Sequence, residues 1–156
     1  MKRMIKMALL GGLLVSAAAP ALADKAAEDK IKARQGYYQL VKSNAGPLFG
    51  MAKGDIEYDA KVAATAANNL KTLSVLDNGH LWIPGTSKEE MPGKTRALKK
   101  IWDTYPAIGD KIGGFKKAVD ALAANAGNGL DALRANVGPL GGACKACHDE
   151  FRADKF

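Results

Sequence analysis

Apolar residues recur three or four positions apart along four stretches of this chain, which is the spacing of one face of an α-helix. The clearest stripe lies near the C-terminus and consists of Leu130, Leu133, Val137, Leu140, Cys144, Cys147 and Phe151. The other three consist of Ile108, Ile112, Phe115, Val119 and Leu122; of Ala63, Ala66, Leu70 and Leu73; and, within about residues 26–52, of Ile31, Tyr38, Val41, Ala45, Leu48 and Met51. No stretch alternates apolar and polar residues as a half-buried strand does. The pattern predicts an all-α protein.

Turn-forming residues separate the four stretches. Gly54-Asp55 follows the first, and Asp55 or Asp59 is expected to cap the second helix. Residues 77–93 contain three glycines and two prolines and predict the only long loop, while Gly127-Asn128-Gly129 separates the last two helices. Two short turns and one long crossover predict an antiparallel four-helix bundle.

Three prolines fall inside the helical stretches. Pro106 predicts a break that leaves residues 94–104 as a short separate piece before the third long helix. Pro47 and Pro139 predict kinks in the first and last helices.

The first 23 residues have the three parts of a secretory signal peptide. Lys2, Arg3 and Lys6 are positive, an apolar run spans residues 7–15, and Ala21-Leu22-Ala23 supplies small residues at the cleavage position. A membrane anchor is disfavoured because the run is shorter than the ~20 residues that span a bilayer. We expect cleavage after Ala23 and one exported domain, residues 24–156, with no membrane attachment.

The charge of the chain argues against a nucleic-acid partner. The 23 basic and 16 acidic residues give a net charge of +7, and removal of residues 1–23 takes away three basic side chains, leaving 20 against 16, or +4. This charge is spread along the chain with no basic cluster interleaved with aromatic residues, so it indicates a solvated surface.

The segment Cys144-Lys145-Ala146-Cys147-His148 has the C-x-x-C-H pattern of c-type haem attachment. On a helix, Cys147 lies about 60° to one side of Cys144 and His148 about 40° to the other, so the three side chains leave one face. Two thiols can then add to the two vinyl groups of a porphyrin while the imidazole reaches its iron. The pattern predicts one covalent haem c per chain, with His148 as the metal ligand.

Other chemistries fit these residues less well. A redox dithiol usually opens a helix after a strand, and no βαβ pattern is present. A zinc site needs four ligands, and beyond the motif the chain offers only the remote His80. A disulfide across two intervening residues would close almost no loop and stabilise little.

Beyond the haem motif, the chain resembles the cytochrome c′ family over essentially all of residues 24–156. The residues that carry the resemblance are Ala33-Arg34-Gln35-Gly36-Tyr37-Tyr38, Lys71-Thr72-Leu73-Ser74, Pro84-Gly85-Thr86, Ile101-Trp102 and Gly142-Ala143-Cys144-Lys145-Ala146-Cys147-His148-Asp149. The resemblance implies a periplasmic antiparallel four-helix bundle that is often a homodimer through its first two helices.

The resemblance also implies how the iron is coordinated. Tyr38 stands where the family places a residue that blocks the sixth coordination site, and a low-spin branch instead has a methionine ligand there. We therefore expect a five-coordinate, high-spin iron. Met51 lies roughly 20 Å further along the helix and cannot share an iron with Tyr38, whereas Met91 and His80 in the loop stay open as ligands. Ligation by a Tyr38 tyrosinate would require ionisation against a usual pKa of ~10.

Four further residues are assigned to the haem pocket. By resemblance, Arg34 and Gln35 approach the haem propionates, and Thr95 is a third candidate for the same contact. Arg152, four residues after His148, is expected to line the pocket on the histidine side of the iron. Beyond it, Asp154 and Lys155 are expected to be a frayed terminus.

Two functions are compatible with these residues. The first is the binding of nitric oxide and carbon monoxide, which reach the iron by displacing Tyr38. The alternative is a low-spin electron-transfer cytochrome with a redox partner protein. Enzymatic activity is not expected, because peroxidase chemistry needs a distal histidine and arginine, and the only spare histidine is His80.

Overall fold

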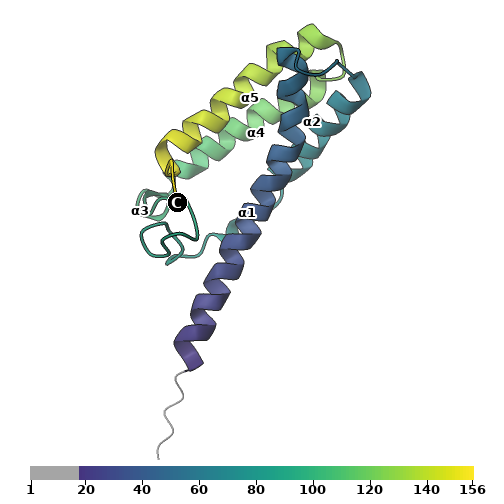
Figure 1. Cartoon of the computed structure of the whole chain (residues 1–156). Helices are drawn as coiled ribbons and strands as arrows, with labels where there is room; N and C mark the ends of the chain where they lie inside the picture. The colour runs from purple at the N-terminus through teal and green to yellow at the C-terminus, as the bar shows by residue number, and fades with distance from the viewer. Residues whose placement is uncertain (1–17) are drawn as a thin grey trace, which may run out of the picture.

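In the computed structural model, which describes residues 18–156 and their side chains from residue 24 onward, four long helices lie side by side. The helices are α1 (Ala18–Lys53), α2 (Ala60–Ser74), the short α3 (Lys100–Asp103), α4 (Ala107–Asn125) and α5 (Leu130–Phe151), with the 3₁₀ turn η1 (Gly79–Leu81) between α2 and α3. The N-terminal part of α1 runs past the ends of the other long helices (Figure 1).

The four long helices pack in a ring, since α1 contacts α2 and α5, and α4 contacts α2 and α5. No strand is present between residues 18 and 156, where an isolated bridge between Ala97 and Arg152 is the single β-type pairing. The predicted all-α antiparallel bundle is therefore confirmed. None of the described helices is long and apolar enough to cross a membrane.

The core lies where the predicted stripes meet. Its fully buried side chains come from all four long helices: Leu48, Met51, Leu70, Val119, Leu122, Leu133 and Leu140. Burial of one such side chain contributes about 1.5–3 kcal/mol to the free energy of folding. Packing of these stripes against one another therefore stabilises the bundle.

The predicted helix boundaries are largely confirmed. The Oδ1 atom of Asp59 accepts a hydrogen bond from the Val62 amide at 2.9 Å and caps α2. Pro106 separates α3 from α4 as expected. Both α1 and α5 continue through Pro47 and Pro139, so neither proline ends its helix.

Residues 1–17 of the expected signal peptide lie outside the described part of the chain, and its residues 18–23 form the start of α1. Neither observation tests the cleavage site, which stays a prediction.

The C-terminal tail after α5 is hydrogen-bonded to the long loop, so the expectation of a frayed terminus is wrong. The Arg96 carbonyl accepts from the Ala153 amide at 2.8 Å, and the Arg96 side chain donates to the carbonyls of Ala153 and Asp154 at 2.6 and 2.5 Å. Lys88 donates to the Lys155 carbonyl at 2.5 Å. The C-terminus consequently lies beside α3 and the loop (Figure 1).

Candidate haem site

The residues of the C-x-x-C-H motif occupy the last two turns of α5. Cys144 and Cys147 are half-buried free thiols, and burial raises the pKa of both. His148 is more exposed, and burial together with the charges of Arg152 and Arg96 lowers its pKa. At neutral pH the imidazole is therefore in the uncharged form that binds a metal.

Apolar side chains become exposed together at the end of the bundle that carries this motif. On α4 the stripe passes from the fully buried Val119 to Ile112, which is 42% exposed. On α1 it passes from the buried Leu48 to Tyr38, which is 45% exposed. On α5 it continues from the buried Leu140 into the half-buried cysteines. The three helices thus present apolar surface that a flat, largely apolar porphyrin would cover.

Tyr38 on α1 faces the cysteines of α5. The proximity shows in the raised pKa of Tyr38, for which burial is the main cause and the Cys147 thiol the next. The ring makes edge-to-face contacts with Tyr37 and Trp82, with centroid distances of 5.0 and 6.4 Å. The raised pKa keeps Tyr38 protonated at neutral pH, which argues against a tyrosinate ligand.

Arg34 lies one helical turn before Tyr38 and is only 4% exposed. Its guanidinium donates to the hydroxyl and carbonyl oxygens of Thr86, both at 2.9 Å, and stacks 4.7 Å from the centre of the Trp82 ring. No carboxylate lies within 4.0 Å of it among the described side chains, and burial lowers its pKa. A buried cation without an anionic partner is costly, so a haem propionate at this place fits the residues present.

The two weaker propionate candidates make other contacts in the structure. Gln35 is exposed, and its Nε2 donates to the Lys94 carbonyl at 2.8 Å. Thr95 is buried, and its hydroxyl accepts from the Ala97 amide at 3.1 Å. Their contact with a propionate stays a prediction.

Arg152 lies beside His148, and its place in a haem pocket stays a prediction. Helix α5 ends at Phe151, and the extended backbone of Arg152 brings its Nη1 to 3.5 Å from Nδ1 of His148. The two residues line a surface hollow of about 440 Å³ together with Arg96, Leu98, Asp149, Ala153 and Asp154.

The alternative ligands occupy other places. Met51 is buried in the core, away from the exposed end of the stripes. His80 is exposed on η1, and Met91 lies half-buried in a turn of the loop. In the part of the chain from residue 18 onward, no three His, Cys, Asp or Glu side chains group as a metal site would require.

Sequence analysis missed Trp82, which contacts both Tyr38 and Arg34 and whose carbonyl accepts from Nε1 of Trp102 at 3.0 Å. It lies in a loop without periodicity, and the available signal was that the chain has only two tryptophans. Trp102 is part of the family resemblance, which assigns it no role at the site.

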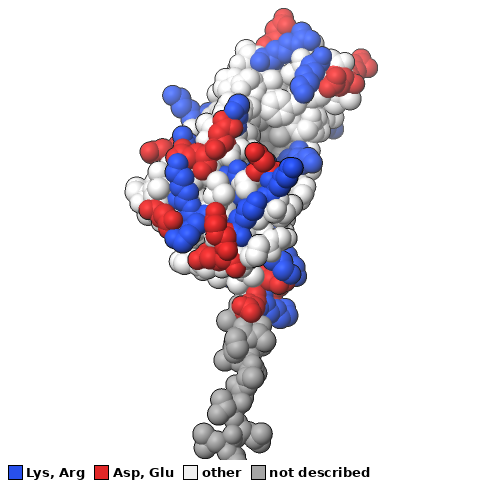
Figure 2. Space-filling view, turned by 60° about the vertical axis from the view of Figure 1, so that its left-hand side comes forward, with Lys and Arg blue, Asp and Glu red and all other residues white. Residues whose placement is uncertain are grey.

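The charged side chains near the motif form local ion pairs. Glu150 on α5 accepts from Lys100 at 2.9 Å and from Lys111 at 3.1 Å, and these bonds lower its pKa. On the face shown in Figure 2, basic and acidic side chains are interspersed.

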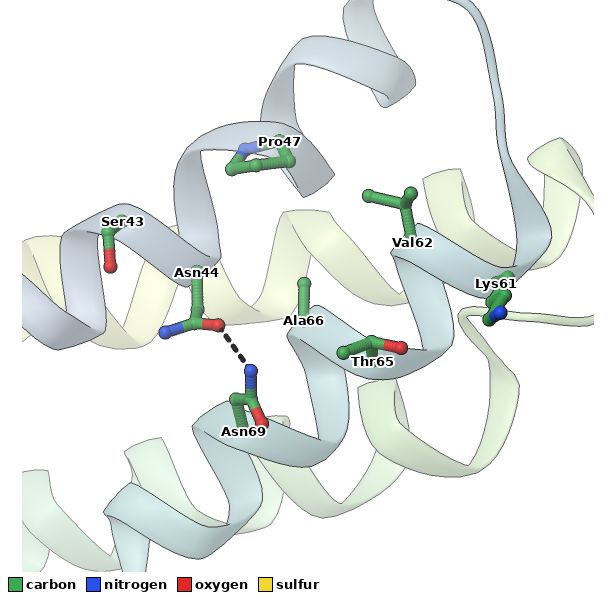
Figure 3. Close-up of a pocket in the computed structure, with 8 residues that line it drawn as sticks. All are labelled: Ser43, Asn44, Pro47, Lys61, Val62, Thr65, Ala66 and Asn69. Atoms are coloured by element: carbon green, nitrogen blue, oxygen red, sulfur yellow. Dashed lines mark hydrogen bonds between the residues drawn. The ribbon is translucent and has the colours of Figure 1, made fainter.

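A second hollow, of about 320 Å³, lies between α1 and α2 and is separate from the motif (Figure 3). It is lined by Ser43, Asn44, Pro47, Lys61, Val62, Thr65, Ala66 and Asn69. Asn69 donates to Asn44 across it at 2.9 Å. It contains no group that ligates iron well.

Comparison with known proteins agrees with this geometry. The family model described as cytochrome c′ matches residues 29–152. The chain belongs to the cytochrome c′ family. The cytochrome c′ of Cereibacter sphaeroides is 42% identical over 147 residues, which cover 94% of this chain and 97% of that protein. Members of this family bind haem c, so the chain is a haem protein of the cytochrome c′ type.

Solved structures of cytochromes c′ share the fold. The structure named as cytochrome c′ from Rhodobacter Spheriodes has a TM-score of 0.80 at 43% identity, covering 83% of this chain and 98% of that one. Two variants from Alcaligenes xylosoxidans, one with bound carbon monoxide and one ferrous with bound NO, each have a TM-score of 0.69. They are 34% and 33% identical, and each match covers 97% of the variant and 82% or 81% of this chain.

Proposed function

We propose that this cytochrome c′ carries one haem c attached through Cys144 and Cys147, with His148 as the axial ligand, and that it binds nitric oxide and carbon monoxide at the opposite face. When bound, the haem supplies an iron with one open coordination position. The chain supplies the attachment, the axial imidazole and the surroundings of the open position.

The position of Tyr38 carries this proposal. It is a protonated phenol on α1 near the cysteines of α5, which supports a place beside the sixth coordination position, where it would be a poor ligand. An uncharged diatomic molecule can enter by pushing the ring aside. Water and anions gain little there, because burying a polar or charged group without partners is unfavourable. The gas-bound Alcaligenes xylosoxidans structures support the same ligands for this chain.

The test is an optical and electron paramagnetic resonance spectrum of the purified ferric protein, with mass spectrometry of the chain. A high-spin spectrum and a mass increased by one haem support the proposal. A clean low-spin spectrum would contradict the open site, point to Met91 or His80 as a ligand, and favour an electron carrier. Loss of the haem from the chain on acid–acetone extraction would contradict covalent attachment.

Binding rather than catalysis is proposed because the residues around Tyr38 offer no acid–base pair. The groups that act on Tyr38 are the two cysteine thiols that would hold the haem, Arg34, which stays charged, and Tyr37, whose pKa is raised by burial. His80 lies on η1, exposed to solvent.

We also propose export to the periplasm after cleavage at Ala23, and a homodimer through α1 and α2. Leu40 and Val62 support the dimer, because both are exposed apolar side chains on these two helices. N-terminal sequencing of the mature protein tests the cleavage. Sedimentation of Val62→Glu against Val75→Glu, a change at an exposed residue after α2, tests the interface: only the first should give monomers, and a dimer in both would contradict it.

A further inference from the structure

The hollow on the histidine side of the motif is rich in hydrogen-bond donors. Arg96, from the long loop, and Arg152, from the tail, both line it beside His148. Neither guanidinium has a carboxylate within 4.0 Å among the side chains of residues 24–156. Two positive charges therefore lie at one open hollow without a close counter-charge.

The acidic residues at the hollow do not supply that counter-charge directly. Asp149 pairs with Lys145 at 2.5 Å. Asp154 accepts from Arg96 through its backbone carbonyl, and its carboxylate offsets part of the charge only from beyond 4.0 Å.

The contact between Arg152 and His148 favours an acceptor at the hollow once the histidine holds a metal. Nη1 of Arg152 is 3.5 Å from Nδ1 of His148. A guanidinium only donates hydrogen bonds. If Nε2 of His148 is the metal ligand, Nδ1 carries the ring proton and also donates. Two donors at this distance repel each other, and a group that accepts from both would relieve the repulsion.

We propose that this hollow binds one small planar oxyanion, held by the guanidinium of Arg152 and the Nδ1–H group of His148, with Arg96 as the second positive charge. Two oxygens of a planar anion match the parallel N–H groups of a guanidinium. The volume of about 440 Å³ holds such an anion with some water. The anion would accept the hydrogen bond of the axial histidine and so adjust its basicity from outside the gas-binding face.

Nitrate and acetate are suitable probes, since they share this chemistry. Each is titrated calorimetrically into the haem-loaded protein by replacing chloride at constant ionic strength. We expect saturable binding of one anion per chain, at least tenfold weaker in Arg152→Gln and only partly restored in Arg152→Lys. Arg134→Gln is the matched control: Arg134 is an exposed arginine on α5, outside the hollow, that pairs with Asp131 at 3.9 Å and donates to the Ala52 carbonyl at 2.9 Å. Its loss should leave anion binding unchanged.

A second readout is spectroscopic. In the ferrous protein, resonance Raman should show the iron–histidine stretching vibration shifting with anion concentration in the wild type but not in Arg152→Gln. Binding of nitrate alone assigns the site to inorganic oxyanions, and binding of acetate as well extends it to carboxylates; both support the proposal.

Three results would overturn it: no saturable binding, which means that solvent alone fills the hollow; equal binding in Arg152→Gln; or a change in the haem absorption spectrum that places the anion on the iron's open face. None of these measurements depends on the affinity for gases, so failure of the anion proposal and failure of the proposed gas binding can be distinguished.

Discussion

Replacement of Tyr38 by alanine tests most directly whether this ring restricts access to the iron. If a gas reaches the iron by displacing this ring, the free energy of displacement is subtracted from the free energy of binding. Removing the ring should return that free energy, and the affinity for carbon monoxide should rise.

The size of the increase follows from the contacts that displacement breaks. The ring makes two edge-to-face pairs, with Tyr37 at 5.0 Å and Trp82 at 6.4 Å. Such pairs contribute about 0.5–1.5 kcal/mol each. Losing both costs about 1–3 kcal/mol, which corresponds to an affinity change of about 5- to 140-fold.

The assay is a carbon monoxide titration of the ferrous protein followed in the Soret band. Tyr38→Phe keeps the ring and both pairs, so its affinity should stay within about threefold of the wild type. Tyr105→Ala, at a tyrosine that is 78% exposed, is the control for a tyrosine lost elsewhere. A Tyr38→Ala affinity within twofold of the wild type would refute the reasoning, because the ring would then not restrict the iron.

Three further predictions follow from groups around the site and core. Burial raises the pKa of Tyr38 above its unfolded value. The contribution of this group to stability is therefore complete below about pH 10 and is lost as the pH rises further. Urea unfolding should show this loss in the wild type and a smaller loss in Tyr38→Phe. Tyr58→Phe should lower the free energy of unfolding by about 1–3 kcal/mol. The lost hydroxyl donates to the Ala126 carbonyl and accepts from the Gly129 amide in the α4–α5 turn, both at 2.9 Å. An unchanged urea midpoint would contradict this prediction. Arg34→Gln should lower the free energy of unfolding by about 1.5–3 kcal/mol in the same assay, because the hydrogen bonds to Thr86 are lost. A more stable variant would contradict this, since the cost of burying the charge would then exceed the contribution of those bonds.

The helices could be predicted because their determinants are local. A stripe such as Leu133, Val137 and Leu140 has helical spacing within itself, and all three side chains are buried as expected. The cap at Asp59 and the break at Pro106 likewise depend on a few neighbouring residues. The C-x-x-C-H motif is local too, which is why the cofactor could be predicted before any contact was known.

The contacts that sequence analysis missed join residues far apart in the chain. Trp82 meets Arg34 and Tyr38 because the long loop folds back on α1, and no periodicity describes that path. Ile112 continues an apolar stripe and yet is 42% exposed. A stripe predicts that one face of the helix is apolar, but it does not predict which group covers that face. A haem, which members of the family bind, has the size and apolar character to cover this face.

The pairing of the C-terminal tail with the long loop has a consequence for how the chain is made and handled. Part of the loop is held by the tail that follows α5, since the carbonyls of Ala153, Asp154 and Lys155 accept from Arg96 and Lys88, whereas Arg34 on α1 holds another part through Thr86. These loop contacts therefore form only after residues 153–155 have been synthesised, whereas the turn between α1 and α2 can form early. An affinity tag fused directly to Phe156 would crowd these contacts, whereas a tag on the N-terminal part of α1, which extends beyond the other long helices, would not.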